Sequence, residues 1–173
     1  MKSVLVSVLV LFCLCSEAAE SINLHDVANT WEKSKAPARI QQAMEVLTKN
    51  ELAECIAYSP DLTNRQRLER RIFSAVKVDI GSDTNETLLV VSPSKCWDLR
   101  GVHAIRYWMV EVTATSKIRV LLDSSDDEIR FERSRTKGYR DVTTYYGTGS
   151  TCRYRFNGRT YRPLPPTLKD ECL

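Results

Sequence analysis

The spacing of apolar residues changes near residue 75, and this change constrains the fold more than any other feature of the sequence. From about 23 to 73 apolar residues recur at helical spacing, as in 40–47, whereas later they alternate with polar residues, as in 152–156. The sequence therefore predicts an α+β fold that is mainly β. Short N-terminal helices precede an antiparallel meander of about seven or eight strands, which curls like a propeller or a barrel and so hides its edges.

Helix-start signals subdivide the N-terminal part. Pro37 suits the first position of a helix that contains residues 40–47. The segment 48–51, Thr-Lys-Asn-Glu, has the form of a capping box and predicts a second short helix. A similar signal at 63–66 predicts a third helix that ends near residue 73.

Runs rich in β-branched and aromatic residues predict the strands. They lie at 75–80, 88–92, 104–114, 118–122, 129–132, 142–146 and 152–156. Turn-forming residues at 81–83, 124–127, 137–138, 147–150 and 157–158 separate or follow these runs. Asn157 and Gly158 both tolerate positive φ, so we expect a hairpin turn there.

The N-terminus has the pattern of a secretory signal peptide. Lys2 precedes a run of roughly a dozen apolar residues, and Ala18 is a small residue at a suitable cleavage position. The run is shorter than the ~20 residues that span a bilayer. A lipid anchor at Cys13 or Cys15 is the less favoured alternative, because bulky residues precede both cysteines.

These observations predict three parts: a signal peptide over 1–18, a helical segment over 19–74 and an antiparallel β domain over 75–173. We expect a periplasmic or secreted protein without a transmembrane segment. The tail from Pro163 is expected to be extended.

Four cysteines lie after the signal peptide, and an even number in an exported protein predicts two disulfides. Three pairings are possible. We favour Cys96–Cys152 between strands and Cys55–Cys172, which would tie the tail to a helix. A zinc site is disfavoured because no two of these cysteines are closely spaced.

Composition argues against several functions. The net charge of +3 is too small to indicate nucleic-acid binding by itself, and two histidines leave little room for histidine-based catalysis. Asp126 and Asp127 form an acidic pair, but we expect solvated charges at a hairpin turn. We therefore predict that the protein is not an enzyme.

The predicted turn at 138–142, Gly-Tyr-Arg-Asp-Val, is the strongest candidate binding element. Tyr139 and Arg140 are residue types that often anchor protein interfaces, because they combine contact area with polar groups. The alternative is an ordinary turn whose tyrosine packs on the sheet.

Residues 76–162 resemble a family of bacterial periplasmic proteins that carries a Gly-Tyr-Arg-x-Leu loop and a Tyr-x-Phe-x-Gly-x-x-Tyr hairpin. The matching segments here are 138–142 and Tyr154-Arg155-Phe156-Asn157-Gly158-Arg159-Thr160-Tyr161. The family includes immunity proteins of bacterial-killing type IV secretion systems, similar to inhibitors of invertebrate-type lysozyme. The resemblance implies that Gly138, Tyr139, Arg140, Asp141 and Val142 bind in the active-site cleft of a lysozyme-like peptidoglycan hydrolase.

The same resemblance implies a calcium-type loop over 79–87. Asp79, Asp83, Asn85 and Glu86 provide the side-chain oxygens that a hard cation prefers. A plain β-turn is the favoured interpretation, because Gly81 stands where a side-chain oxygen is usual and Thr84 where glycine is usual. We expect no other cofactor.

The leading hypothesis is thus a periplasmic immunity protein, active in bacterial competition, that blocks a secreted peptidoglycan hydrolase through the 138–142 loop. The first alternative is a non-catalytic envelope module that binds glycan or calcium. The second is an envelope enzyme that uses Asp126 or Asp127.

Overall fold

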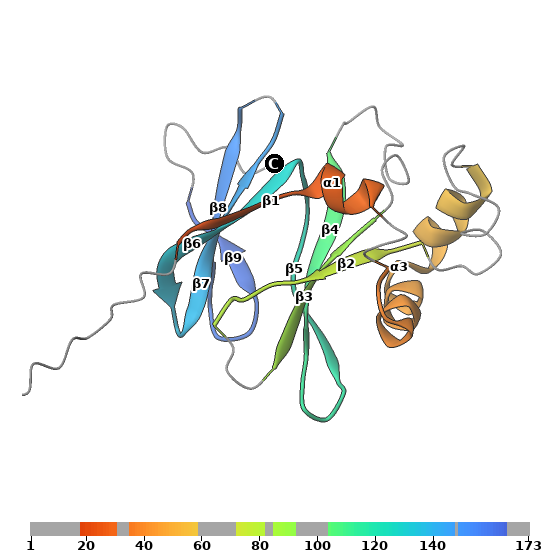
Figure 1. Ribbon diagram of the computed structural model, residues 1–173, viewed down its shortest axis with the longest axis horizontal. Coiled ribbons are helices and arrows are strands. Elements are labelled where there is room, and N and C mark those ends of the chain that lie inside the picture. Colours follow the sequence, from red (N-terminus) through yellow and green to blue (C-terminus); the bar gives the residue numbers. More distant parts are fainter. Residues whose placement is uncertain are drawn as a thin grey trace, which may run out of the picture.

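The computed structural model describes residues 18–30, 35–58, 72–81, 85–92, 104–147 and 149–165. Two antiparallel sheets form its centre (Figure 1). One has five strands in the order β1-β6-β7-β8-β9, and the other has four strands in the order β2-β3-β4-β5. The elements are β1 (Glu20–Asn23), α1 (Leu24–Asn29), α3 (Ala38–Tyr58), β2 (Ser74–Lys77), β3 (Glu86–Val91), β4 (Ile105–Val112), β5 (Ile118–Asp126), β6 (Glu128–Thr136), β7 (Tyr139–Tyr145), β8 (Thr151–Phe156) and β9 (Tyr161–Pro163).

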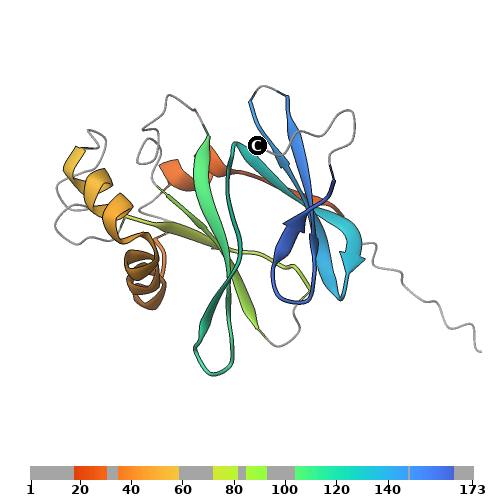
Figure 2. The same ribbon diagram turned by 180° about the vertical axis from the view of Figure 1, so that it is seen from behind.

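Two apolar clusters hold these elements in layers. The first joins both sheets and α1, with Leu24, Leu89, Tyr107 and Phe131 fully buried. The second lies between α3 and the four-stranded sheet. The helix α3 therefore covers the side of this sheet that faces away from the five-stranded sheet, as the two opposite views indicate (Figures 1 and 2).

Strand β4 is buried on both faces because the four-stranded sheet lies between the two apolar clusters. Tyr107 and Met109 belong to the cluster between the sheets, whereas Trp108 and Val110 belong to the cluster under α3. Alternate residues of a strand point to opposite faces, so a strand covered on both sides needs a nearly continuous apolar run. The sequence Ile-Arg-Tyr-Trp-Met-Val-Glu-Val of β4 fits this requirement.

The helix prediction at 40–47 is confirmed, because α3 contains these residues. Ile40 and Met44 are buried in the cluster under α3. The backbone of Lys49 departs from helical values, with φ 19° and ψ −93°, so α3 is two helical pieces joined by a kink. The predicted second helix start at 48–51 coincides with this kink. The third predicted helix, at 63–73, falls almost entirely outside the described residues.

The prediction of a mainly β protein is confirmed. The prediction that the strands form one curled antiparallel meander is wrong, because they form two separate sheets. The chain passes from the four-stranded to the five-stranded sheet between Asp126 and Glu128, with only Asp127 between β5 and β6. The predicted hairpin turn at 124–127 is therefore a crossing between sheets. Across the described ranges there are nine strands and no closed barrel.

Two strands were not predicted because their partners are distant or their sequences short. Glu20–Asn23 pairs with β6, more than 100 residues later, although its sequence was assigned to the helical segment. Tyr161–Pro163 pairs with β8 as a three-residue strand at the start of the predicted extended tail.

The two predicted hairpin turns differ in backbone conformation. Lys137 and Gly138 both have positive φ, 52° and 85°, as a tight two-residue hairpin turn requires. At 157–160 only Gly158 has positive φ, and the side chain of Asn157 accepts hydrogen bonds from the amides of Arg159 and Thr160. This turn is a wider loop stabilised by an asparagine side chain.

Cys152 is buried and disulfide-bonded. The side chains of Cys55, Cys96 and Cys172 lie outside the described residues, so both proposed pairings stay predictions. No helix in the described part of the chain is long and apolar enough to cross a membrane.

Candidate functional site

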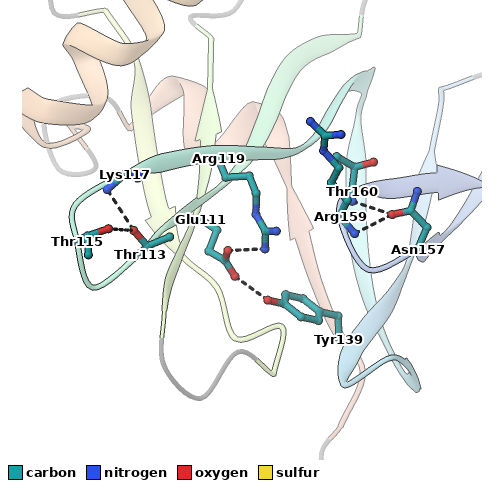
Figure 3. A network of polar contacts seen from close by, with 9 residues as sticks. All are labelled: Glu111, Thr113, Thr115, Lys117, Arg119, Tyr139, Asn157, Arg159 and Thr160. Atoms are coloured by element: carbon teal, nitrogen blue, oxygen red, sulfur yellow. Dashed lines mark hydrogen bonds and ion pairs between the residues drawn. The ribbon is translucent and has the colours of Figure 1, made fainter.

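The side chain of Tyr139 points inward, toward the four-stranded sheet (Figure 3). Its ring stacks on Phe156 with a centroid distance of 4.0 Å, and its hydroxyl donates a 2.7 Å hydrogen bond to Oε1 of Glu111. The Tyr139 phenol is therefore committed to contacts within the protein. This matches the alternative of a turn whose tyrosine packs on the sheet.

Arg140 is 4% exposed and its guanidinium donates to three backbone carbonyls. The acceptors are Phe131 at 2.6 Å, Glu132 at 2.8 Å and Ala18 at 2.9 Å. Strand β6 loses regular register with β7 between Phe131 and Arg135, so carbonyls there lack their usual partners in the sheet. The Arg140 side chain satisfies these carbonyls and so stabilises the irregular strand.

The side chains of Tyr139 and Arg140 are therefore directed into the protein and not outward, as interface anchors would be. Binding of a hydrolase by residues 138–142 stays a prediction. Val142 is also buried, in the cluster between the sheets. Asp141 is 8% exposed and lies on the opposite side of β7 from Val142. Of the predicted binding residues, only Gly138 is exposed, at the turn itself.

Glu111 and Arg119 join Tyr139 in a polar network between the two sheets (Figure 3). The Glu111 side chain is 1% exposed and receives a 2.6 Å hydrogen bond from Arg119 Nη2. Burial alone would raise the pKa of Glu111, but hydrogen bonds from Tyr139, Asn85 and Arg119, with the charge of Arg119, lower this pKa below its usual value. Glu111 is thus held as a carboxylate.

Three turns surround this network and form one end of the molecule, which we call the basic loop end. They are residues 113–117 between β4 and β5, residues 135–139 at the hairpin where β6 ends and β7 begins, and residues 157–160 between β8 and β9. Nζ of Lys137 donates a 2.6 Å hydrogen bond to the carbonyl of Asn157, which links two of the turns. Figure 3 places the third turn on the other side of Glu111 and Arg119.

The basic loop end carries cationic residues on its surface. The three turns contain Lys117, Arg135, Lys137 and Arg159 and no acidic residue. All four cations are exposed. The buried carboxylate of Glu111 contacts this end through the hydroxyl of Tyr139. The surface that these turns present to a partner is therefore positively charged.

The predicted calcium ligands have other contacts. Asp79 accepts a hydrogen bond from the Gly81 amide at 2.9 Å, as in a simple turn. Glu86 forms an ion pair with Arg39 at 2.9 Å. Asn85 hydrogen-bonds to Glu111, and Asp83 is not among the described residues. Within the described residues no three His, Cys, Asp or Glu side chains gather as a metal site, and calcium stays a prediction.

The prediction of two solvated aspartates is wrong for Asp126, which is 8% exposed. Oδ2 of Asp126 accepts hydrogen bonds from the Tyr107 and Ser124 hydroxyls at 3.1 and 2.9 Å. Asp127 instead contacts His25, with 2.8 Å between Oδ1 and Nε2. These two carboxylates thus have separate surroundings.

No protein-family model, curated protein or solved structure matches the chain. Neither Glu111 nor Arg119 is among the site residues predicted from the sequence. One signal points to Glu111: it is an acidic residue in an otherwise apolar end of β4. A buried carboxylate needs donors, which predicts a partner such as Arg119 on the adjacent strand.

Proposed function

We propose that the protein is an exported, non-catalytic inhibitor that binds a lysozyme-like peptidoglycan hydrolase through the basic loop end. One observation supports this most: the three turns of this end expose Lys117, Arg135, Lys137 and Arg159 and contain no acidic residue. The sequence resemblance supplies the class of partner, and the signal-peptide pattern supplies the export.

The electrostatics of such a complex are favourable. Glycoside hydrolases use a pair of carboxyl groups in the active-site cleft. Exposed lysine and arginine side chains on three turns complement that negative charge and accelerate association. Tyr139 and Arg140 contribute indirectly, because they hold the 135–139 turn in place through Glu111 and the β6 carbonyls.

The test measures hydrolysis of a peptidoglycan suspension by purified invertebrate-type and chicken-type lysozymes. We expect the protein to inhibit at least one of them near one-to-one stoichiometry, and inhibition to weaken as salt rises because salt screens the charges. The double variant Lys137→Glu/Arg159→Glu should weaken inhibition at least 10-fold. Lack of both binding and inhibition at micromolar concentration would refute the proposal.

A matched control separates a specific surface from general attraction between opposite charges. Lys49 and Arg133 are exposed and lie outside the basic loop end. The variant Lys49→Glu/Arg133→Glu changes the net charge equally and should inhibit like the wild type. An equal loss of inhibition in both double variants would remove the basic loop end from the mechanism.

A further inference from the structure

The outer side of the five-stranded sheet carries a pocket of about 260 Å³. Its lining comes from β6, β7 and β8 and from Leu164, which follows β9. Val142 and Phe156 belong to the cluster between the sheets, so the side chains of Asp141 and Arg155 beside them project to the opposite side. This pocket is thus separate from the network of Glu111 and Tyr139.

One wall of the pocket is acidic and rigid. Asp141 is 8% exposed, and its carboxylate accepts hydrogen bonds from Ser134 at 2.7 Å and Thr136 at 2.6 Å. The carboxylate of Glu132 accepts a 2.8 Å hydrogen bond from Thr143. Hydroxyl donors thus orient both carboxylates, and the ionic contact of Glu132 with Nε of Arg130 is long, at 3.7 Å.

The other wall is basic. Arg153 and Arg155 lie on β8 and both line the pocket. The closest atoms of the Arg155 and Asp141 ion pair, Nε and Oδ2, are 3.7 Å apart, and the Arg155 side chain is 57% exposed. The ion pair is weak because it is long and its guanidinium is largely in solvent, so a ligand can replace it at little cost.

We propose that this pocket binds a small zwitterion with the chemistry of a free α-amino acid. The ammonium group lies against Glu132 and Asp141, and the carboxylate lies against Arg153 and Arg155, where a guanidinium can bind it with two hydrogen bonds. The four charged side chains sum to zero. A simple anion or cation would therefore meet like charge on one wall, whereas a zwitterion is complementary to both.

The size of the pocket fits this ligand class. Pockets for drug-sized ligands measure ~300–1,000 Å³, so a pocket of about 260 Å³ suits a single amino acid better. Leu164 adds an apolar surface to the lining. L-Leucine is accordingly the probe of choice.

The experiment is an NMR titration of the full chain with L-leucine, N-acetyl-L-leucine and L-leucinamide. We expect saturable shifts of the amides in β6, β7 and β8 with L-leucine. Affinity should fall at least 10-fold for each blocked analogue, because one lacks the ammonium and the other lacks the carboxylate. Equal binding of all three compounds, or no saturable shift with L-leucine, would overturn the proposal.

Two single variants test the two walls separately. Glu132→Gln and Arg153→Gln should each weaken L-leucine binding at least 10-fold, while the thermal unfolding curve verifies that each variant is folded. Arg133→Gln is the matched control, since Arg133 is exposed on β6 but does not line the pocket. Unchanged affinity in both folded variants, or an equal loss in the control, would contradict the assignment. The outcome does not depend on the lysozyme assay, which tests a different surface.

Discussion

The hydroxyl of Tyr139 donates a 2.7 Å hydrogen bond to Glu111, and this bond connects the five-stranded sheet to the four-stranded sheet. Glu111 is 1% exposed at its side chain, so each donor to its carboxylate matters. The hydrogen bond from Tyr139 to the buried carboxylate of Glu111 therefore fixes the position of the 135–139 turn. Its position relative to the 113–117 turn depends on that bond (Figure 3).

Tyr139→Phe keeps the ring that stacks on Phe156 and removes only the hydroxyl. We expect the free energy of unfolding to fall by about 1–2 kcal/mol at neutral pH, because the buried carboxylate loses a donor. Urea unfolding measures the change. Tyr146→Phe, at a half-buried tyrosine of the next turn, is the control and should change stability by less than about 0.5 kcal/mol.

The same variant should alter the dependence of stability on pH. The pKa of Glu111 is lowered in the folded protein, so its contribution is present above the unfolded pKa and is lost as pH falls through the folded pKa. The stability difference between wild type and Tyr139→Phe should therefore shrink below about pH 4. A difference that grows on acidification would contradict the role given to this hydrogen bond.

Arg140 should be far more sensitive to substitution than an exposed arginine. Arg140→Ala leaves the carbonyls of Phe131 and Glu132 without their donor and should cost about 3 kcal/mol or more. Arg140→Lys should recover little of this loss, because an ammonium lacks the planar fork that reaches several acceptors. Thermal unfolding of both variants, with Arg133→Ala as the exposed control, measures the effect. Near-wild-type stability of Arg140→Lys would contradict the geometric requirement.

The apolar run of β4 could be recognised in the sequence, whereas the inward direction of the Arg140 side chain could not. Local patterns were enough for most strands, because alternation acts over a few residues. The predicted helix start at 48–51 coincides with the kink at Lys49, but the hydroxyl of Thr48 donates to the Met44 carbonyl at 2.7 Å. The inward direction of Arg140 depends on an irregularity in β6, which no local pattern marks. The crossing at Asp127 likewise depends on which sheet receives β6, so a turn-like sequence was interpreted as a hairpin.

Gly138 tests the conformation of the 137–138 turn directly. A Cβ atom at this position would have no neighbour within 4 Å, so Gly138→Ala adds no clash. Its φ of 85° is unfavourable for alanine, and we expect a loss of about 1 kcal/mol in unfolding free energy. Gly138→Asn should lose less, because asparagine tolerates positive φ. Equal losses for the two variants would indicate a cause other than backbone strain.

Asp126 gives the protein a second, opposite dependence on pH. Burial raises the pKa of Asp126 to about 6, although hydrogen bonds from Ser124 and Tyr107 act in the other direction. The folded state therefore binds more protons than the unfolded state between about pH 4 and pH 6. Stability from this group falls as pH rises through that range, and the ionised carboxylate stays unfavourable above it.

Asp126→Asn removes the ionisation and keeps an oxygen that can accept from Tyr107 and Ser124. We expect the variant to be about 1–3 kcal/mol more stable than the wild type at pH 7.5 and to differ little at pH 4.5, as measured by urea unfolding at both values. Asp123→Asn is the control, because Asp123 lies on the same strand with its side chain 43% exposed. Should Asp126→Asn be less stable than the wild type at pH 7.5, the carboxylate must be stabilising where it lies, and burial cannot be the dominant influence on its pKa.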